Sequence, residues 1–158
     1  MIAFASANPF NGTRVVALKI FGARLGARVV IKPGVKVKFP WRLSVGDYSW
    51  IGEDVWIDNL AAVNVGAHSV ISQGAYLCTG NHDWRRESFD LMTAPIEIGS
   101  EVWIAAKAII GPGVSIADRT IVALGTVVTQ SISGASLCTP GKAVIVPRFP
   151  VDESDASR

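Results

Sequence analysis

Histidine is the side chain best suited to moving protons near neutral pH, and this chain has two, His68 and His82. His82 lies in the stretch TGNHDWRR, residues 79–86, between Asn81 and Asp83. An imidazole there could act as a general base that takes the proton of a weakly acidic hydroxyl. Cys78 shortly precedes it, so a cysteine nucleophile activated by this histidine is the competing chemistry.

The polar residues around His82 each have a structural and a functional interpretation. Asp83 could orient the imidazole or bind a substrate, or it could be a solvated loop carboxylate. Asn81 could stabilise a turn or touch a substrate. Asp58 and Asn59 interrupt an otherwise aliphatic segment, where they could bind a substrate or satisfy the hydrogen bonds of their own turn.

A six-residue repeat defines the elements that must hold these residues. Twelve hexads can be written in register, in residues 45–62, 65–82 and 98–133. All begin with Ile, Val or Leu, and the fifth residue is Ser, Thr, Ala or Val in all but LCTGNH and VTQSIS. This period fits neither an amphipathic helix nor a coiled coil, and a β-sandwich would alternate with a period of two. Short strands joined by turns can form it.

The repeat therefore predicts an all-β solenoid in which one aliphatic residue per hexad points inward. Three hexads make a triangular coil of about 18 residues, and stacked coils bury a continuous aliphatic column. His68 then falls at an ordinary turn position, where we expect a corner residue without a catalytic role. Cys78 takes the second position of its hexad, which favours a packed thiol over a nucleophile.

The regular pattern is interrupted twice. Val63 and Asn64 read as a two-residue insertion, and residues 83–97, charged and aromatic with Pro95, read as a loop that leaves the coil. Long loops in compact folds are often functional, so we expect an active-site loop there. Residues 29–43 resemble a degenerate first coil.

The two ends of the chain differ from the repeat. Residues 11–26 predict a helix that begins near Asn11 or Thr13 and stops at Gly26. Such a helix would cap the open end of the solenoid, although its basic residues also allow contact with an anionic membrane surface. The predicted organisation is an N-terminal segment 1–28, a solenoid domain 29–148 and a disordered tail 149–158.

Composition limits the possible partners and location. The formal charge of +2 and the lack of a basic cluster with interleaved aromatic residues argue against nucleic acid. No apolar segment is long enough to span a membrane, and the N-terminus makes a poor signal peptide. We expect a cytoplasmic protein in which Cys78 and Cys138 are free thiols.

Several segments together resemble a known family. These are NPFNGTR, KIFGARLG, VVIKPGVKVKFPWRL, IGEDVWIDNL, ISQGAYLCTGNHDW, FDLMTAPIEIG and VWIAAKAIIGPGV. They are similar to the colanic-acid-type acetyltransferases of exopolysaccharide biosynthesis, within the hexapeptide-repeat superfamily, from Asn8 to Arg148. The resemblance implies a left-handed parallel β-helix and a homotrimer with active sites between subunits. It also implies O-acetyl transfer from acetyl-CoA to a sugar hydroxyl, without a required metal.

The same resemblance assigns roles to individual residues. His82 would be the catalytic base, Asp58 or Asn59 would contact the acceptor sugar, and the backbone N–H of Ala106 would donate to the thioester oxygen. The donor would be held by Trp103, Leu124, Thr129 and Gln130. Relatives often carry Lys at the position of Gln130 and a different turn at residues 139–143, so Lys142 or Arg148 could supply the missing charge for the nucleotide end of CoA.

Two other classes of protein remain as alternatives. A γ-type carbonic anhydrase shares the expected fold, but it needs three histidine ligands for zinc and this chain has two histidines. A non-catalytic β-helix scaffold would bind no CoA and would tolerate the loss of His82. We expect the acetyltransferase.

Overall fold

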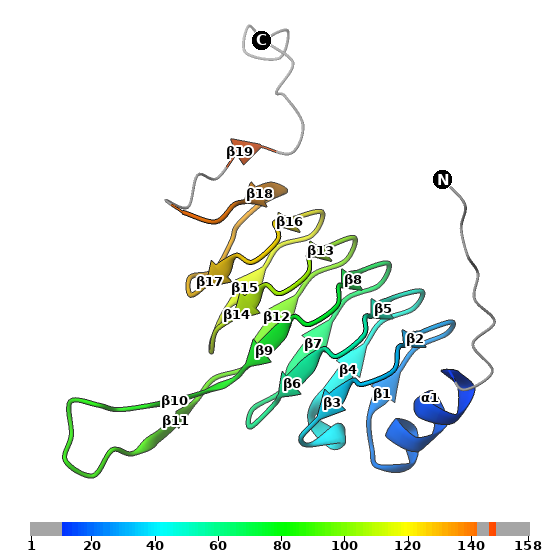
Figure 1. Ribbon diagram of the computed structural model, residues 1–158, viewed down its shortest axis with the longest axis horizontal. Helices are drawn as coiled ribbons and strands as arrows, with labels where there is room; N and C mark the ends of the chain where they lie inside the picture. Colours follow the sequence, from blue (N-terminus) through cyan, green and yellow to red (C-terminus); the bar gives the residue numbers. More distant parts are fainter. Residues whose placement is uncertain (1–10, 142–145, 148–158) are drawn as a thin grey trace, which may run out of the picture.

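Figure 1 shows a computed structural model in which short strands stack into a parallel β-solenoid with one helix at its N-terminal end. The structure describes residues 11–141 and 146–147. Helix α1 spans Asn11–Ile20. Sheet A consists of β1 (Arg24–Leu25), β4 (Leu43–Val45), β7 (Val63–Val65), β12 (Ile96–Ile98) and β15 (Ser115–Ile116).

The other two walls are built in the same way. Sheet B contains β2 (Val30–Ile31), β5 (Trp50–Ile51), β8 (Val70–Ile71), β13 (Trp103–Ile104), β16 (Ile121–Val122), β18 (Ser136–Cys138) and β19 (Val146–Pro147). Sheet C contains β3 (Lys36–Val37), β6 (Trp56–Asp58), β9 (Tyr76–Cys78), β14 (Ile109–Ile110) and β17 (Val127–Val128). Except for β19, which pairs antiparallel, each strand of these three walls pairs in parallel with strands of neighbouring coils, which confirms the predicted solenoid.

The core is the aliphatic column that the repeat predicts. All twelve first positions of the hexads are buried, and they are Val45, Ile51, Ile57, Val65, Ile71, Leu77, Ile98, Ile104, Ile110, Ile116, Val122 and Val128. The small residues at the fifth hexad position lie inside the solenoid where the chain bends from one sheet to the next. Ser49 and Ser69 are fully buried there, and the Ser49 hydroxyl oxygen accepts a hydrogen bond from the backbone N–H of Ser69 at 2.9 Å.

The coils differ in length, and the extra residues gather at one corner. Leu25 pairs with Val45, and Val45 with Val65, so the first coils have a repeat of 20 residues. Ile98 pairs with Ile116, which gives 18. The additional residues lie between sheets C and A, in the 3-10 turn Pro40–Arg42 (η1) and in residues 59–62. The predicted insertion at Val63 and Asn64 is therefore wrong, because Val63 is a fully buried wall residue of β7.

The N-terminal helix is shorter than predicted. It ends at Ile20, and Gly22 follows with a φ of +92°. The N–H of Gly22 donates to Lys19 and the N–H of Ala23 donates to Leu18, which is the hydrogen-bond pattern of a glycine-terminated helix. Gly26 is not the stop, because Leu25 already belongs to β1 and the solenoid begins before residue 29.

The three outer faces carry different side chains. Sheet A turns mostly polar residues outward, namely Arg24, Ser44, Asn64, Glu97 and Ser115. Sheets B and C turn mostly apolar residues outward, including Trp50, Val70, Trp103, Trp56, Ile109 and Val127. A monomer seldom exposes so much apolar surface, so these two faces are candidate interfaces.

Candidate active site

The stretch around His82 leaves the solenoid as a β-hairpin. Strand β10 (Gly80–His82) pairs antiparallel with β11 (Leu91–Thr93), and His82 lies opposite Leu91. Figure 1 shows this hairpin projecting from the corner between sheets C and A. The predicted loop of 83–97 is corrected at both ends, because the excursion starts at Gly80 and Ile96 is again fully buried in the wall.

The imidazole of His82 is oriented by Phe89, which lies in the hairpin just before β11. Its Nδ1 lies 2.8 Å from the carbonyl oxygen of Phe89, and the two rings stack with centroids 4.3 Å apart and an angle of 7°. A carbonyl oxygen only accepts hydrogen bonds, so Nδ1 carries the proton and Nε2 of the neutral ring keeps its lone pair. Since the side chain is exposed, this nitrogen can receive a proton from a bound hydroxyl.

Phe89 is a site residue that the sequence did not reveal. Its contribution is a backbone carbonyl and a ring face, and neither depends on a recognisable motif. Its φ of +48° is unusual for a non-glycine residue and turns the chain at the hairpin end. Only the folded hairpin brings this carbonyl back to the imidazole.

Asn81 and Asp83, the neighbours of His82, hold the hairpin itself. The Asn81 side-chain oxygen accepts from the backbone N–H of His82 at 2.8 Å. Asp83 accepts from the backbone N–H of Arg85 at 3.1 Å and forms an ion pair with Arg86 at 3.3 Å. The group that orients the imidazole is therefore the Phe89 carbonyl and not Asp83.

A polar cluster lies at the base of the hairpin on sheet C. The Asp58 carboxylate is 3.0 Å from the Lys38 ammonium and accepts a hydrogen bond from the Tyr76 hydroxyl at 3.2 Å. Burial, reinforced by the neighbouring Cys78 thiol and Asp58 carboxylate, raises the pKa of Tyr76 well above its usual range. The phenol thus stays protonated and remains a donor to Asp58.

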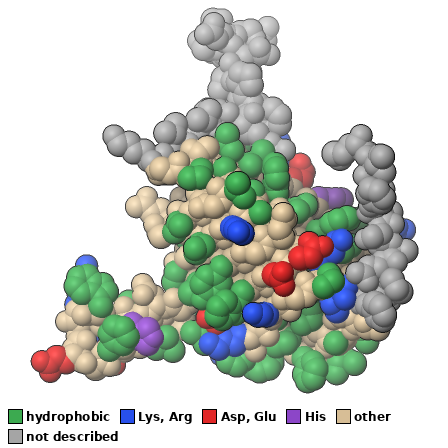
Figure 2. All heavy atoms as spheres, in the orientation of Figure 1, with side chains coloured by type: hydrophobic (Ala, Val, Ile, Leu, Met, Phe, Trp, Pro, Cys, Tyr) green, Lys and Arg blue, Asp and Glu red, His purple; other side chains and the backbone are tan. Residues whose placement is uncertain are grey.

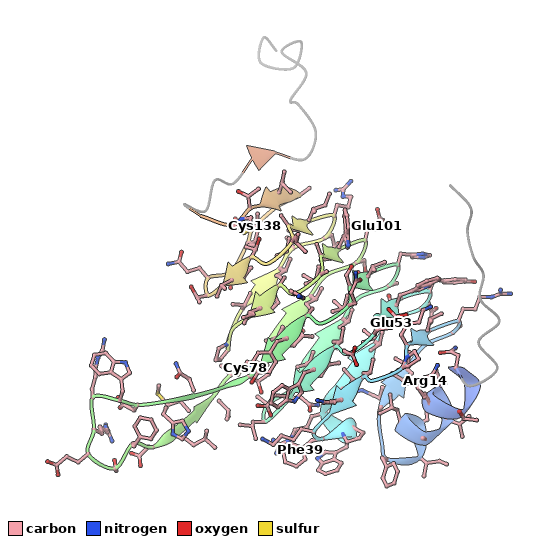
Figure 3. The ribbon with its side chains drawn as sticks, viewed as in Figure 1. Arg14, Phe39, Glu53, Cys78, Glu101 and Cys138 are labelled. Atoms are coloured by element: carbon pink, nitrogen blue, oxygen red, sulfur yellow. The ribbon has the colours of Figure 1, made fainter. Side chains whose placement is uncertain are left out.

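Cys78 belongs to this cluster and not to His82. Its thiol donates to the carbonyl of Gly80 at 3.3 Å, and Figure 3 places it at the base of the hairpin. Both Cys78 and Cys138 are free thiols, as the sequence predicted. The arrangement favours the packed thiol over the cysteine nucleophile.

Asn59 is a correction to the expected acceptor-binding set. The residue is fully buried, and its side-chain amide spans one coil to Phe39. The amide oxygen accepts from the Phe39 N–H at 2.9 Å, and the amide nitrogen donates to the Phe39 carbonyl at 2.7 Å. Because the side chain is fully buried and both of its polar atoms bind Phe39, these contacts favour the structural role over contact with a substrate.

Three of the residues expected to hold the donor line one groove on sheet B. Trp103, Ala106 and Leu124 surround a hollow of about 470 Å³, together with Ser72, Gln73, Ala105, Ile121, Ala123 and Leu137. The Trp103 indole N–H donates to the Ser72 hydroxyl at 2.9 Å, which fixes the ring across the groove. The Ala106 carbonyl accepts from Gly125, whereas its N–H donates to no group in the described part of the chain.

The other expected donor residues lie elsewhere. Thr129 follows β17 at the corner between sheets C and A, where it lines a hollow of about 380 Å³ with Asn81 and four further residues. Gln130 lines a neighbouring hollow with Thr129. Lys142 and Arg148 lie outside the described residues. Neither His82 nor any other hairpin residue lines the Trp103 groove, so the two halves of the expected site do not share a cavity in this chain.

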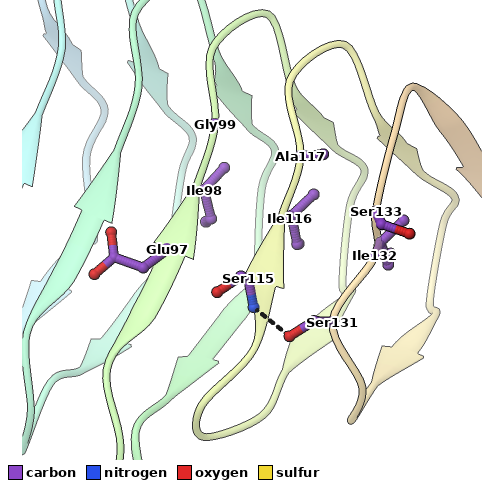
Figure 4. A pocket seen from close by; sticks show the side chains of 9 residues that line it. All are labelled: Glu97, Ile98, Gly99, Ser115, Ile116, Ala117, Ser131, Ile132 and Ser133. Atoms are coloured by element: carbon purple, nitrogen blue, oxygen red, sulfur yellow. Dashed lines mark hydrogen bonds between the residues drawn. The ribbon is translucent and has the colours of Figure 1, made fainter.

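One further hollow contains none of the expected residues. Figure 4 shows it on sheet A, where Glu97, Ser115, Ser131 and Ser133 lie along its wall. Its volume is about 380 Å³, and the Ser131 hydroxyl oxygen accepts from the N–H of Ser115 at 3.0 Å. His68 lies at another corner, where its ring stacks on that of Tyr48 with centroids 5.1 Å apart.

Comparisons with known proteins agree with the fold and narrow the family. No model of a protein family matches the sequence. The chain is 43% identical over 133 residues to WcaF of Escherichia coli, a protein named for acetyl transfer in colanic acid biosynthesis, with 84% of this chain and 73% of WcaF covered. It is 27% identical over 118 residues to the galactoside O-acetyltransferase of Escherichia coli, covering 73% of this chain and 58% of that protein.

Solved structures show the same architecture. The hexapeptide-repeat acetyltransferase VCA0836 of Vibrio cholerae, solved with acetyl-coenzyme A, matches with a TM-score of 0.80 at 27% identity, over 85% of this chain and 75% of that one. The solenoid and the identity to WcaF therefore agree on the family. The chain belongs to the hexapeptide-repeat acetyltransferases, in the branch that contains the colanic acid protein WcaF.

Proposed function

We propose that this enzyme moves an acetyl group from acetyl-CoA to a sugar hydroxyl of an exopolysaccharide precursor or a related glycan. The acceptor class is supported by the name of WcaF, and the donor by the acetyl-coenzyme A in the VCA0836 structure. The single observation that carries the mechanism is the imidazole of His82, with Nδ1 tied to a carbonyl and Nε2 open.

His82 acts as the general base in a direct transfer. Nε2 takes the proton of the sugar hydroxyl while its oxygen attacks the thioester carbonyl carbon. The carbon–sulfur bond then breaks, the acetyl group stays on the sugar oxygen, and the protonated imidazole returns its proton to the CoA thiolate. The Ala106 N–H donates to the thioester oxygen as negative charge develops there. Its lack of a partner among the described residues supports this role.

The groove beside Trp103 receives the pantetheine arm. Its lining is mostly small or apolar and includes Ala105, Ala106 and Ala123 together with the Trp103 indole. An extended arm can lie there close to backbone groups, beside the exposed side chain of Leu124. Thr129 and Gln130 lie at the corner next to the hairpin, and together with Lys142 they contact the pantetheine and the nucleotide end of the bound CoA.

The acceptor binds at the base of the hairpin. Asp58 offers a carboxylate that Lys38 and Tyr76 already hold in place, which suits recognition of sugar hydroxyls. Asn81 and Asp83 flank His82 in the chain, and the amide hydrogens of Asn81, which no bond among the described residues uses, remain donors for a substrate.

The working site forms between copies in a homotrimer. The hairpin with His82 and the Trp103 groove belong to different parts of one chain, so a second copy must supply one of them. A cyclic trimer needs two different contact faces per subunit, and sheets B and C provide two apolar ones. The free thiols Cys78 and Cys138 fit the cytoplasm, where we place the enzyme.

The arrangement of the two histidines supports the acetyltransferase over a zinc hydratase or a non-catalytic scaffold. A zinc hydratase would need histidines that converge, but His68 is stacked on Tyr48 at a corner away from the hairpin. A passive scaffold would give no reason for an exposed histidine to be held in one tautomer by a backbone carbonyl.

The test is the release of CoA thiol from acetyl-CoA in the presence of a panel of sugars. His82→Ala should lower the rate by about a hundredfold or more, because the base is lost while the binding surfaces stay. His68→Ala, which removes the other histidine, is the matched control and should keep the rate. Both variants should still be stabilised by acetyl-CoA in a thermal shift. An unchanged rate in His82→Ala would overturn the mechanism.

A further inference from the structure

Positive charge is concentrated at one end of the solenoid. Residues 1–46 contain eight Lys and Arg and no Asp or Glu, whereas residues 47–158 contain seven Lys and Arg and thirteen Asp and Glu. The first segment thus carries +8 and the second −6, which together give the net charge of +2. All eight cations belong to α1 and the first coil, and they are Arg14, Lys19, Arg24, Arg28, Lys32, Lys36, Lys38 and Arg42.

Some of these cations have structural partners and others do not. The Arg14 guanidinium donates to the Ile31 carbonyl at 2.8 Å, and Lys38 pairs with Asp58. Lys19, in the last turn of α1, and Arg24, which points outward from β1, form no ion pair within the described part of the chain. Their charge is therefore available to an external anion.

Large apolar side chains are exposed at the same end. Ile20 is 75% exposed, Phe21 65% and Trp41 58%. They form one patch, because a Cβ placed on Gly22, the residue after Phe21, would lie 3.0 Å from Cβ of Trp41. The Phe39 ring extends the patch, with its centroid 5.1 Å from that of Trp41.

The role of α1 as a cap does not account for this patch. The capping contacts come from Val15 and Leu18, which pack partly buried against the core. Val16 and Ile20 are exposed, and no residue of the helix is buried. Figure 2 shows hydrophobic and basic side chains together along the lower edge of the molecule, where Figure 1 places α1 and the first coil. The outer side of the cap would be polar if water were its only neighbour.

We infer that this end of the solenoid docks on an anionic phospholipid bilayer. Ile20, Phe21 and Trp41 enter the boundary between headgroups and acyl chains, and Lys19 and Arg24 lie at the level of the lipid phosphates. This contact is peripheral, since none of the described helices is long and apolar enough to cross a membrane.

The combination of side chains selects a bilayer over other anionic partners. A soluble polyanion would be attracted by the cations but would leave the three apolar side chains in water. A bilayer with anionic lipids satisfies both, because apolar burial and attraction to phosphate add in the same contact. In the proposed cyclic trimer the equivalent ends face one side, so three patches would engage one surface and strengthen the binding.

The experiment is flotation of the full-length protein with vesicles of phosphatidylcholine alone or with about one third phosphatidylglycerol. Binding should be confined to the anionic vesicles and should weaken as salt is raised. The double variant Ile20→Ser/Phe21→Ser should lose at least about tenfold in vesicle affinity, because the buried apolar area is lost. Lys19→Glu/Arg24→Glu should lose at least about 25-fold, because each of the two charges near the surface contributes about fivefold.

Matched controls separate the patch from general properties of the chain. Trp84→Ser removes a side chain that is 73% exposed at the hairpin, and Arg85→Glu/Lys107→Glu changes the net charge equally but away from the first coil. Both should bind vesicles like the original protein. Circular dichroism and light scattering confirm that each variant keeps its fold and assembly.

Three results would overturn the inference. Equal binding to neutral vesicles, or equal losses in the control variants, would mean that the patch is not specific. Binding to heparin but not to anionic vesicles would assign the charge to a polyanion. A change of oligomeric state in Phe21→Ser, without a change in vesicle binding, would mean that a second copy covers the patch. Loss of acetyl transfer alone concerns the proposed function and leaves membrane binding unaffected.

Discussion

The proposed chemistry of this enzyme depends on a few atoms around His82. A hydrogen bond from Nδ1 to the Phe89 carbonyl and a stacked ring fix the direction in which Nε2 points. The orienting group is a backbone atom, so a change of side chain at Phe89 can alter the ring contact but cannot remove the acceptor. The hairpin thus keeps the same tautomer as long as β10 and β11 stay paired.

At the residue scale, Asn59 offers a test of structural against substrate-binding roles. Asn59→Ala leaves the Phe39 N–H without its partner, while the Phe39 carbonyl keeps its hydrogen bond from the Arg42 N–H, so the free energy of unfolding should fall by about 1–3 kcal/mol. Asn64→Ala removes only an exposed hydrogen bond to Glu97 and should cost less than about 1 kcal/mol. Urea titration measures both. A variant at Asn59 that keeps its stability but raises the KM for the sugar would return this residue to the acceptor site.

The strands of this fold are too short to be stable alone, so the coil must be treated as the stabilising element. Glycine at the second hexad position lets one coil approach the next. A Cβ on Gly66 would lie 2.5 Å from the backbone carbon of Gly99 in the following coil. No side-chain movement can relieve a contact between backbone atoms and a Cβ, so this spacing is fixed by the glycine.

At the element scale, Gly66→Ala should therefore lower the free energy of unfolding by at least about 2 kcal/mol. Gly12→Ala is the control, because nothing lies within 4 Å of a Cβ there. Gly12 is also inside α1, where alanine favours the helix by up to about 1 kcal/mol. Thermal unfolding followed by circular dichroism compares the two. Equal stability of both variants would contradict the account of coil spacing.

Across the whole molecule, the distribution of side chains on the three faces supports the proposed trimer. Sheet A is polar outside, while sheets B and C carry exposed Trp, Ile and Val side chains. The faces therefore predict an assembly that buries two walls and leaves one in water. The proposed active site depends on the same assembly, because its two halves lie apart in one chain.

At the scale of the assembly, one charged residue on sheet C should separate the subunits. Val127, exposed to 61% in the single chain, would bury a carboxylate at the interface as Val127→Asp, so the trimer should dissociate and activity should fall at least about tenfold. Ser115→Asp places the same charge on sheet A and should change neither property. Light scattering reports the mass. A fully active monomer would show that one chain suffices.

The regular part of the fold could be predicted from the sequence because it depends on local spacing. Twelve aliphatic residues at intervals of six have one compact solution, and all twelve are buried as expected. The insertion near Val63 was misplaced because spacing shows that residues were added but not at which corner they leave the wall. The helix end was misplaced for a similar reason, since the sequence offers both Gly22 and Gly26 as stops. Only the folded chain shows that Gly22 has the positive φ and lies against Trp41.

The candidate base and groove residues could be named from the sequence, His82 by its position at the end of a hexad and Trp103 and Ala106 by family resemblance. The sequence by itself also determined the solenoid, because hydrophobic spacing is a local property of the chain. Only the tertiary structure decided that the Phe89 carbonyl orients His82, that the Asn59 side chain hydrogen-bonds to the Phe39 backbone, and that the hairpin does not line the Trp103 groove. Each of these depends on contacts between residues that the chain must fold to bring together.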